Sequence, residues 1–309
     1  MLRIHFTAED LLRTRLAAGP APLIELGMAV ATLQRGDPVF ARWARRTRRP
    51  RAALPLFELI PPTAAGPLFV DPVSDGFDDG LDRVLSTPDA YARAEILRAC
   101  RPTPWTRGLA DHDSGAWRIL EEALRSAYDA IIAPEWPRIR ASFDADVAWR
   151  RTLLAGGGIR ETLTGLHPGA RWNGTTLEFD VAGESEHTPG GRGVTLLPSS
   201  VWTGRPLVGT HSDGSMLLVY PSLTPMPLVD TDAGDALAAL LGPTRAAVLA
   251  LLVDDRTNGE VARRAGISAA SASAHAKTLR EAGLVVTRRA GKAVLHVATP
   301  LGLRLLDGA

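Results

Sequence analysis

The sequence has little cysteine and no long apolar run. Its 309 residues include one cysteine, Cys100, which excludes an intramolecular disulfide and a metal site built from several thiolates. No uninterrupted apolar stretch is long enough to cross a bilayer, and no apolar run follows the first arginine as it would in a secretion signal. We therefore expect a soluble, cytoplasmic protein with no membrane partner.

Aromatic residues are missing from the last part of the chain. All 7 Trp, 7 Phe and 3 Tyr lie at or before Tyr220, so the final 74 residues must pack an aliphatic core. Charge divides at the same place, because residues 236–309 carry 10 basic and 5 acidic residues whereas residues 1–235 carry 25 basic and 29 acidic ones. A short basic segment attached to a long acidic one is typical of a polyanion-binding module on a separate body.

The rest of the composition is that of an ordinary globular protein. Hydrophobic residues make up 45% and charged residues 22%, so the chain can bury sizeable cores. The length suits two domains. The shifts in charge and aromatic content predict an N-terminal domain over residues 1–230 and a C-terminal domain over residues 231–309. We expect the fold class α+β.

The N-terminal domain is predicted to be mainly helical over residues 1–168. A short strand over residues 2–6 leads into a capping box at Thr7–Asp10, and apolar residues recur behind it at helical spacing. Pro134 and Pro137 separate two later helices, because proline is tolerated in a first helical turn and not in the interior. The predicted helices cover residues 23–33, 39–46, 91–99, 116–154 (two helices) and 159–166.

A β-rich region is expected over residues 169–222. Alternating apolar residues flank Asn173-Gly174, which is a strong signal for a hairpin. Further short strands are predicted over residues 193–197, 201–203 and 216–220. Together they predict a small, mostly antiparallel sheet that completes the N-terminal domain.

The C-terminal domain contains two capped helices in succession. An apolar helix pair over residues 235–252 comes first. A capping box at Thr257–Glu260 opens a helix that ends at Gly266, and Ser268 is the N-cap of the next helix. Two capped helices joined by a short glycine-containing turn form a helix-turn-helix.

The second of these helices has one apolar face and one small, polar face. Ala272, Ala276 and Leu279 recur at helical spacing and are expected to face inward. Small residues allow a helix to approach base edges in the major groove, and serine, histidine and lysine donate to bases or phosphates. The segments 284–289 and 292–297 predict a hairpin, or wing, whose basic tip would meet phosphates or the minor groove. The predicted DNA-binding residues are Ser268, Ala270, Ser271, Ser273, Ala274, His275, Lys277, Thr278, Arg288, Arg289 and Lys292.

At Glu260–Ser268 and Ser271–Val285 the chain resembles the winged-helix ArsR-like repressors. This direct resemblance covers about a quarter of the chain. The start at Leu2–Asp10 and the Trp-Asn-Gly hairpin are similar to those of actinobacterial regulators with a large N-terminal domain. The resemblance implies a homodimer that binds a palindromic double-stranded DNA operator, with contacts at the wing and at Ser271, Ser273, Ala274, His275 and Lys277.

The chain departs from that family in two ways. Ala274 stands where the family often has a long polar residue, so the wing arginines gain importance. The C-terminal domain has no cysteine, and its final helix over residues 301–307 offers a single carboxylate. A thiolate arsenic or zinc sensor is therefore excluded on ligand count, and we expect no metal and no cofactor.

The sequence thus predicts a transcriptional regulator and not an enzyme. We expect a homodimeric repressor controlled by an unknown non-thiolate effector, a small molecule that binds the N-terminal sensing and dimerisation domain. Two alternatives stay open: an enzyme in the N-terminal domain with a winged-helix targeting module, and a protein-binding adaptor. Fixed acid–base or metal chemistry in the β-rich region would favour the enzyme, and indifference to DNA would favour the adaptor.

Several further residues have two interpretations each. His275 contacts DNA or packs on the preceding helix. The run Arg42–Arg51 is a second DNA contact or a solvated face neutralised by the downstream aspartates. Gly156–Gly158 is a phosphate site or a corner between helices. The tryptophans line an effector pocket or belong to the core. The β-rich region also has four scattered polar residues that are metal ligands, acid–base groups, or neither: His167, His187, His211 and Asp213.

Overall fold

The computed structural model describes residues 1–211, 214–223, 233–290 and 293–307. It has a mixed helical and β fold with several small sheets. Its contacts divide the chain into two compact units, Met1–Leu228 and Val229–Ala309. Among the described residues, no helix combines the length and the hydrophobicity needed to span a membrane.

Helix α2 (Pro22–Arg35) is the centre of the helical part of the first unit. Nearly all its residues are buried, because its sequence is apolar on every side. It starts with proline in its first turn and ends at Gly36, which takes the left-handed conformation of a helix stop. The other helices of this part are α3 (Ala41–Arg46), α4 (Leu54–Leu59), α5 (Phe77–Leu85), α6 (Asp89–Ala99), α7 (Pro104–Ala110) and α8 (Ser114–Ala127), whereas α1 (Ala8–Arg13) contacts strand β6 (Val194–Ser199) of the sheets.

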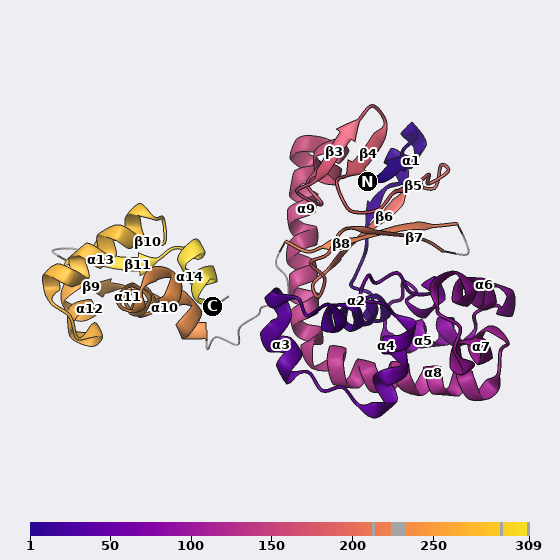
Figure 1. Cartoon of the computed structure of the whole chain (residues 1–309). Helices are drawn as coiled ribbons and strands as arrows, with labels where there is room; N and C mark the ends of the chain where they lie inside the picture. Colours follow the sequence, from indigo (N-terminus) through magenta and orange to yellow (C-terminus); the bar gives the residue numbers. More distant parts are fainter. Residues whose placement is uncertain (212–213, 224–232, 291–292, 308–309) are drawn as a thin grey trace. The chain divides into compact units, whose positions relative to one another are not determined.

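The long helix α9 (Trp136–Thr164) leads from the helical part to the sheets (Figure 1). A π-helical turn (Tyr128–Ile132) and a 3-10 turn (Ala133–Glu135) separate it from α8, which confirms the predicted break at the prolines. Gly158, at φ 75°, kinks α9. The three glycines therefore form the predicted corner between two helical stretches.

The first unit contains two mixed sheets of four strands. One has the order β3-β4-β1-β5 and the other the order β2-β6-β8-β7. The pairs β1–β5, β2–β6 and β6–β8 are parallel. The strands are β1 (Leu2–His5), β2 (Arg15–Leu16), β3 (Ala170–Asn173), β4 (Thr176–Phe179), β5 (Ser185–His187), β6 (Val194–Ser199), β7 (Leu207–Thr210) and β8 (Met216–Pro221).

The expectation of one small, mostly antiparallel sheet was wrong in part: the sheet β3-β4-β1-β5 is mostly antiparallel, but there is a second sheet, β2-β6-β8-β7, and it is mostly parallel. Nearly every residue of β6 and β8 is buried, which is typical of strands covered on both faces. Strand β7 follows β6 in the sequence, but it pairs with the outer edge of β8 and does not lie between β6 and β8. The N-terminal strands β1 and β2 each join one of the sheets. The expected strand at residues 201–203 is irregular, and the Trp202 indole donates a hydrogen bond to the Arg205 carbonyl there.

Two local predictions for the β region are confirmed. β3 and β4 form an antiparallel hairpin that closes at the pair Asn173–Thr176, with Gly174 at φ 60° in the turn. The Thr7–Asp10 capping box is present, and the buried Asp10 carboxylate also accepts a hydrogen bond from the Gly193 backbone. Gly193 has no room for a side chain, because its backbone passes directly over that of Arg13.

Buried polar groups join α9 to the end of β8. The Tyr220 hydroxyl donates to Asp146 Oδ1 at 2.7 Å, and the Leu223 backbone N–H donates to Asp146 Oδ2 at 2.9 Å. Arg150, one turn along α9, donates to Asp146 at 3.4 Å and to the Gly165 carbonyl at 2.6 Å. The side chains of Asp146 and Arg150 are both almost completely buried. Buried charges are stable only when they are paired and hydrogen-bonded, as these two are.

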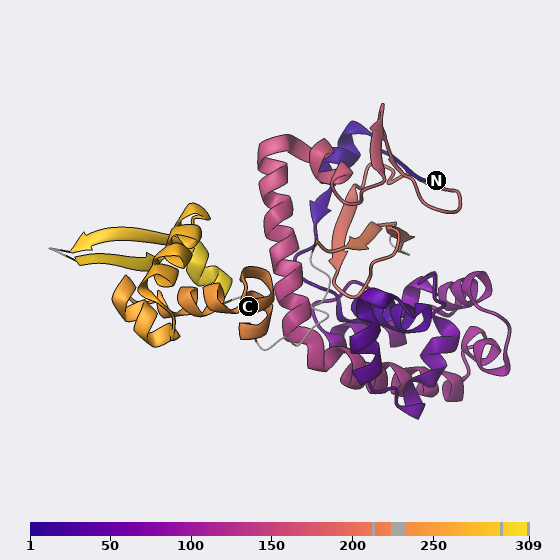
Figure 2. The same cartoon turned by 60° about the vertical axis from the view of Figure 1, so that its left-hand side comes forward.

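The second unit packs helices and a three-stranded sheet around an aliphatic core (Figure 2). Its helices confirm the predicted succession. The strand order is β10-β11-β9, with antiparallel pairs, and β10 and β11 form the predicted hairpin. The elements are α10 (Ala233–Leu241), α11 (Pro243–Leu251), β9 (Arg256–Thr257), α12 (Asn258–Ala265), α13 (Ala269–Glu281), β10 (Val285–Ala290), β11 (Ala293–Ala298) and α14 (Pro300–Asp307).

Candidate nucleic-acid interface

Local capping fixes the turn between α12 and α13. Thr257 and Glu260 form the predicted capping box at the start of α12, and Gly266, at φ 65°, ends that helix in the left-handed conformation. The Ser268 hydroxyl then accepts a hydrogen bond from the Ser271 backbone N–H at 3.0 Å. The turn is therefore short, and α13 leaves it in a defined direction.

One face of α13 is buried and the other is open. Ala272, Ala276 and Leu279 are buried in the core of the second unit, as predicted from their spacing. Ser271 and His275 are half-buried at the borders of this face. The exposed residues among the predicted contacts on and before this helix are Ser268, Ala270, Ser273, Ala274, Lys277 and Thr278.

On the open face, some polar side chains already have a partner within the protein and others do not. The Thr278 hydroxyl donates to the Ala274 carbonyl, and Lys277 lies 3.8 Å from the Glu281 carboxylate, a long and exposed pair. Within the part of the chain that the structure describes, the Ser273 hydroxyl and the His275 ring have no protein partner. Ser273 and His275 are thus free to donate to another molecule, whereas Lys277 would exchange its exposed ion pair with Glu281 for another partner.

The hairpin carries the wing arginines unequally. Arg288 forms an ion pair with Asp255, so part of its charge is already compensated inside the unit. Arg289, opposite Val294 in the hairpin, is exposed and has no carboxylate partner among the described residues. Lys292 lies outside the described residues. Arg289 is therefore the described wing residue with the most available charge.

The structure adds exposed cations that the sequence reasoning left out. Arg263 and Arg264 end α12 and are exposed, as is Arg280 on α13. Arg280 also donates to Thr287 at 3.4 Å, which links α13 to the hairpin. Their positions in the last turns of the two helices were the signal in the sequence, since basic residues at helix ends remain solvated.

A buried histidine supports the hairpin. His296 Nδ1 lies 2.9 Å from the Thr287 hydroxyl across the strands, and burial together with the nearby Arg280 lowers the pKa of the ring. His296 is therefore neutral near pH 7 and acts in packing. It was not among the predicted contact residues.

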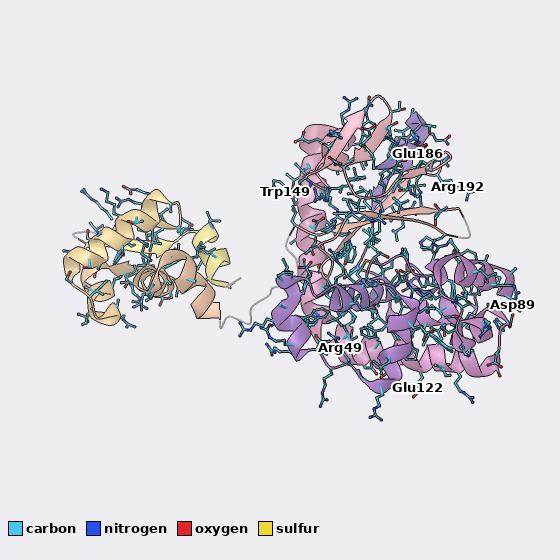
Figure 3. The ribbon with its side chains drawn as sticks, viewed as in Figure 1. Arg49, Asp89, Glu122, Trp149, Glu186 and Arg192 are labelled. Carbon is cyan, nitrogen blue, oxygen red and sulfur yellow. The ribbon has the colours of Figure 1, made fainter. Side chains whose placement is uncertain are left out.

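The arginine run lies on the first unit and is largely exposed. The side chain of Arg49 lies over the Phe57 ring and reaches the Leu33 carbonyl (Figure 3). Two of the aspartates expected to neutralise the run pair elsewhere, because Asp79 binds Arg83 and Asp78 binds Arg125. Both interpretations of the run, a solvated face and a DNA contact, stay predictions.

The remaining candidates divide between core and cavity. Of the tryptophans, Trp43, Trp117 and Trp202 are buried in the core, while Trp149 on α9 is 49% exposed (Figure 3). His187 and His211 line one cavity, whereas His167 packs against Phe179. Asp213 lies outside the described residues. Burial raises the pKa of the half-buried Cys100 thiol to about 11, so little thiolate exists near neutral pH.

Metal binding has no support in the described part of the chain, where no three histidine, cysteine, aspartate or glutamate side chains gather as a ligand set. No family model matches the chain, and no curated protein or solved structure is significantly similar to it.

Proposed function

We propose that this protein is a DNA-binding transcriptional regulator. Its C-terminal unit acts as a winged helix-turn-helix of the ArsR-like type, with α13 as recognition helix and the β10–β11 hairpin as wing. The observation that carries the proposal is the open face of α13, where small side chains alternate with unpartnered donors at Ser273 and His275, together with the exposed Arg289 on the hairpin. Small residues permit close approach to base edges, and the donors and cations meet bases and phosphates.

Charge on the second unit supports this function. Its exposed cations lie on α12, on α13 and on the hairpin, and residues 258–290, which contain these elements, have 6 basic residues and 2 acidic ones. A basic surface on a small module is the electrostatic pattern of a phosphate-binding protein. The exposed cations are Arg263, Arg264, Lys277, Arg280, Arg288 and Arg289.

We further propose that the regulator is a homodimeric repressor. Leu240 on α10 is 71% exposed and Leu301 on α14 is 49% exposed, and these two helices contact each other. Leucines left in water on adjacent helices favour a partner surface. A second copy of the chain would bury them and supply the second recognition helix for a palindromic site.

The test is fluorescence anisotropy of the full chain on DNA from its own upstream region and on scrambled DNA, at two salt concentrations. We expect tighter binding to the upstream DNA. Arg289→Ala should weaken binding and lower the salt slope by about one, as expected for the loss of one phosphate contact. Arg288→Ala should cost less, because Asp255 already pairs with Arg288.

Two matched variants sharpen the result. Asp255→Asn should release Arg288 and leave DNA binding equal or tighter, whereas Arg118→Ala, an exposed arginine on α8 in the first unit, should change nothing. Equal affinity for both duplexes, with no response to Arg289→Ala in a folded protein, would overturn the proposal. The protein-binding adaptor would then be the better description.

A further inference from the structure

The first unit contains a cavity of about 310 Å³, within the size range of small-molecule sites. Its walls come from α2, from the segment 64–71, from Arg98 on α6, and from β5, β7 and β8, which places it between the helical part and the sheets (Figure 1). Much of the lining is apolar: Ile24, Met28, Leu207, Leu217 and Val219. The cavity can therefore enclose the apolar body of a ligand.

Asp71 is an acidic residue of this cavity wall, and it has no ion-pair partner among the described residues. Its carboxylate lies against Gly27 of α2, where a Cβ would be 3.4 Å from Oδ2 and 3.9 Å from the side chain of Ile60. Within the described structure its hydrogen bond comes from its own backbone N–H, and no cation is paired with it. Burial, and to a lesser degree the nearby Glu95, raise the pKa of Asp71 to about 7.

The arginine nearest to Asp71 is already occupied. Arg98 donates to both oxygens of the Glu95 carboxylate, at 2.9 and 2.6 Å, and to the Gly66 carbonyl at 3.0 Å. Glu95 in turn accepts a hydrogen bond from the Leu68 backbone. Glu95, Arg98 and ionised Asp71 together carry one net negative charge.

Four other ionisable side chains line the cavity: Glu184, His187, Arg205 and His211. Burial lowers the pKa of His187, so its ring is neutral near pH 7. His211 acts on Glu95, whose pKa it helps to lower. Glu184 and Arg205 also line the cavity and carry opposite charges.

We propose that this cavity binds a small organic cation, an amine with an apolar body, whose charge pairs with the Asp71 carboxylate. The apolar lining would take up the body of the ligand, and the ammonium group would supply the partner that Asp71 lacks. The inference goes beyond DNA binding and does not depend on it, because every residue that carries it belongs to the first unit.

The proposal implies a pH dependence of affinity. Only ionised Asp71 pairs with a cation, so below about pH 7 the ligand must displace a proton. Affinity should therefore fall roughly tenfold per pH unit on the acid side and level off above pH 7. A neutral or anionic ligand would not follow this curve.

The experiment uses phenethylamine as probe, with 2-phenylethanol as neutral and phenylacetate as anionic counterpart. Binding to the full chain is measured by saturation-transfer NMR and calorimetry at about pH 6 and pH 8. We expect phenethylamine to bind at both pH values, more tightly at pH 8, and better than its two counterparts. Asp71→Asn should weaken it roughly ten- to hundredfold, the range for a hydrogen bond to a charged group.

The matched control is Asp144→Asn, which removes an exposed carboxylate from α9 and should leave binding unchanged. The Asp71→Asn variant should fold, because the substitution removes a charge that burial disfavours. The midpoint of its unfolding transition in urea verifies this. Equal or tighter binding of 2-phenylethanol or phenylacetate, unchanged affinity in Asp71→Asn, or no binding of phenethylamine at millimolar concentration would each overturn the proposal.

Discussion

Burial raises the pKa of two carboxylates in the first unit, Glu25 and Asp71. Glu25, in the first turn of α2, is 1% exposed, and it accepts hydrogen bonds from the Ser199 hydroxyl at 2.9 Å and the Ser200 backbone at 3.2 Å. Burial outweighs these hydrogen bonds and raises the pKa of Glu25 to about 7. Asp71 has the same direction of shift for the same reason.

Stability of the first unit should therefore decrease as pH rises from about 4.5 to 7. In this range unfolded Glu25 loses its proton while folded Glu25 keeps it, so the unfolded state is favoured. The shift corresponds to about 3 kcal/mol for Glu25, and Asp71 adds a loss of the same sign. Glu25→Gln keeps hydrogen-bonding groups at this position and should make the pH profile shallower.

Urea unfolding followed by tryptophan fluorescence at pH 5 and pH 7.5 measures this effect, since every tryptophan precedes Tyr220. Asp144→Asn serves as the control for loss of a negative charge at an exposed site. If the stability of Glu25→Gln depended on pH as steeply as that of the unchanged chain, Glu25 would not be the cause of the pH dependence.

At the scale of elements, α14 depends on a close approach at Gly302. A Cβ at this position would overlap the Leu284 carbonyl, just before β10, and would touch Ala298 at the end of β11. Gly302→Ala should therefore displace α14 from the base of the hairpin and destabilise that region by about 1–3 kcal/mol, the usual cost of overpacking.

Hydrogen exchange of backbone amides in residues 284–307 reports the change in the full chain. Gly259→Ala is the matched control, because a Cβ there meets nothing closer than the Thr257 hydroxyl at 4.0 Å and alanine favours the helix α12. Faster exchange in Gly302→Ala alone is expected. Equal exchange in both variants would show that α14 tolerates a side chain at this position.

At the scale of the whole molecule, the buried apolar residues that the structure describes form three hydrophobic clusters. Two of them lie in the first unit and the aliphatic one lies in the second. Cooperative unfolding requires a shared core, so we expect each unit to unfold in its own transition.

Tryptophan fluorescence reports the first unit, whereas circular dichroism at 222 nm reports helices of both. The two probes should give different urea midpoints, with an extra circular-dichroism transition that fluorescence does not detect. Arg289→Ala, a change in the second unit, should leave the fluorescence curve unchanged. Coincident curves would mean that the two units unfold together.

Local features could be predicted from the sequence because neighbouring residues decide them. The capping boxes at Thr7 and Thr257, the proline break before α9, the Asn173-Gly174 hairpin and the buried face of α13 all depend on residues a few positions apart. The boundary between the units is marked in the sequence by a change in charge and aromatic content. The predicted recognition helix and hairpin follow from the same short-range patterns.

Tertiary structure alone decided which distant segments meet. β6 and β8 run parallel because β7 pairs at the edge, and strands from the N-terminus join both sheets, arrangements that strand composition does not specify. Asp71, Arg98, His187 and His211 are scattered in sequence and come together only when the helices and sheets enclose the cavity. The Asp255 partner of Arg288 is equally invisible before folding. By itself the sequence determined helices, caps and turns through local backbone preferences, while folding determined burial and charge pairing, because these depend on contacts between residues far apart along the chain.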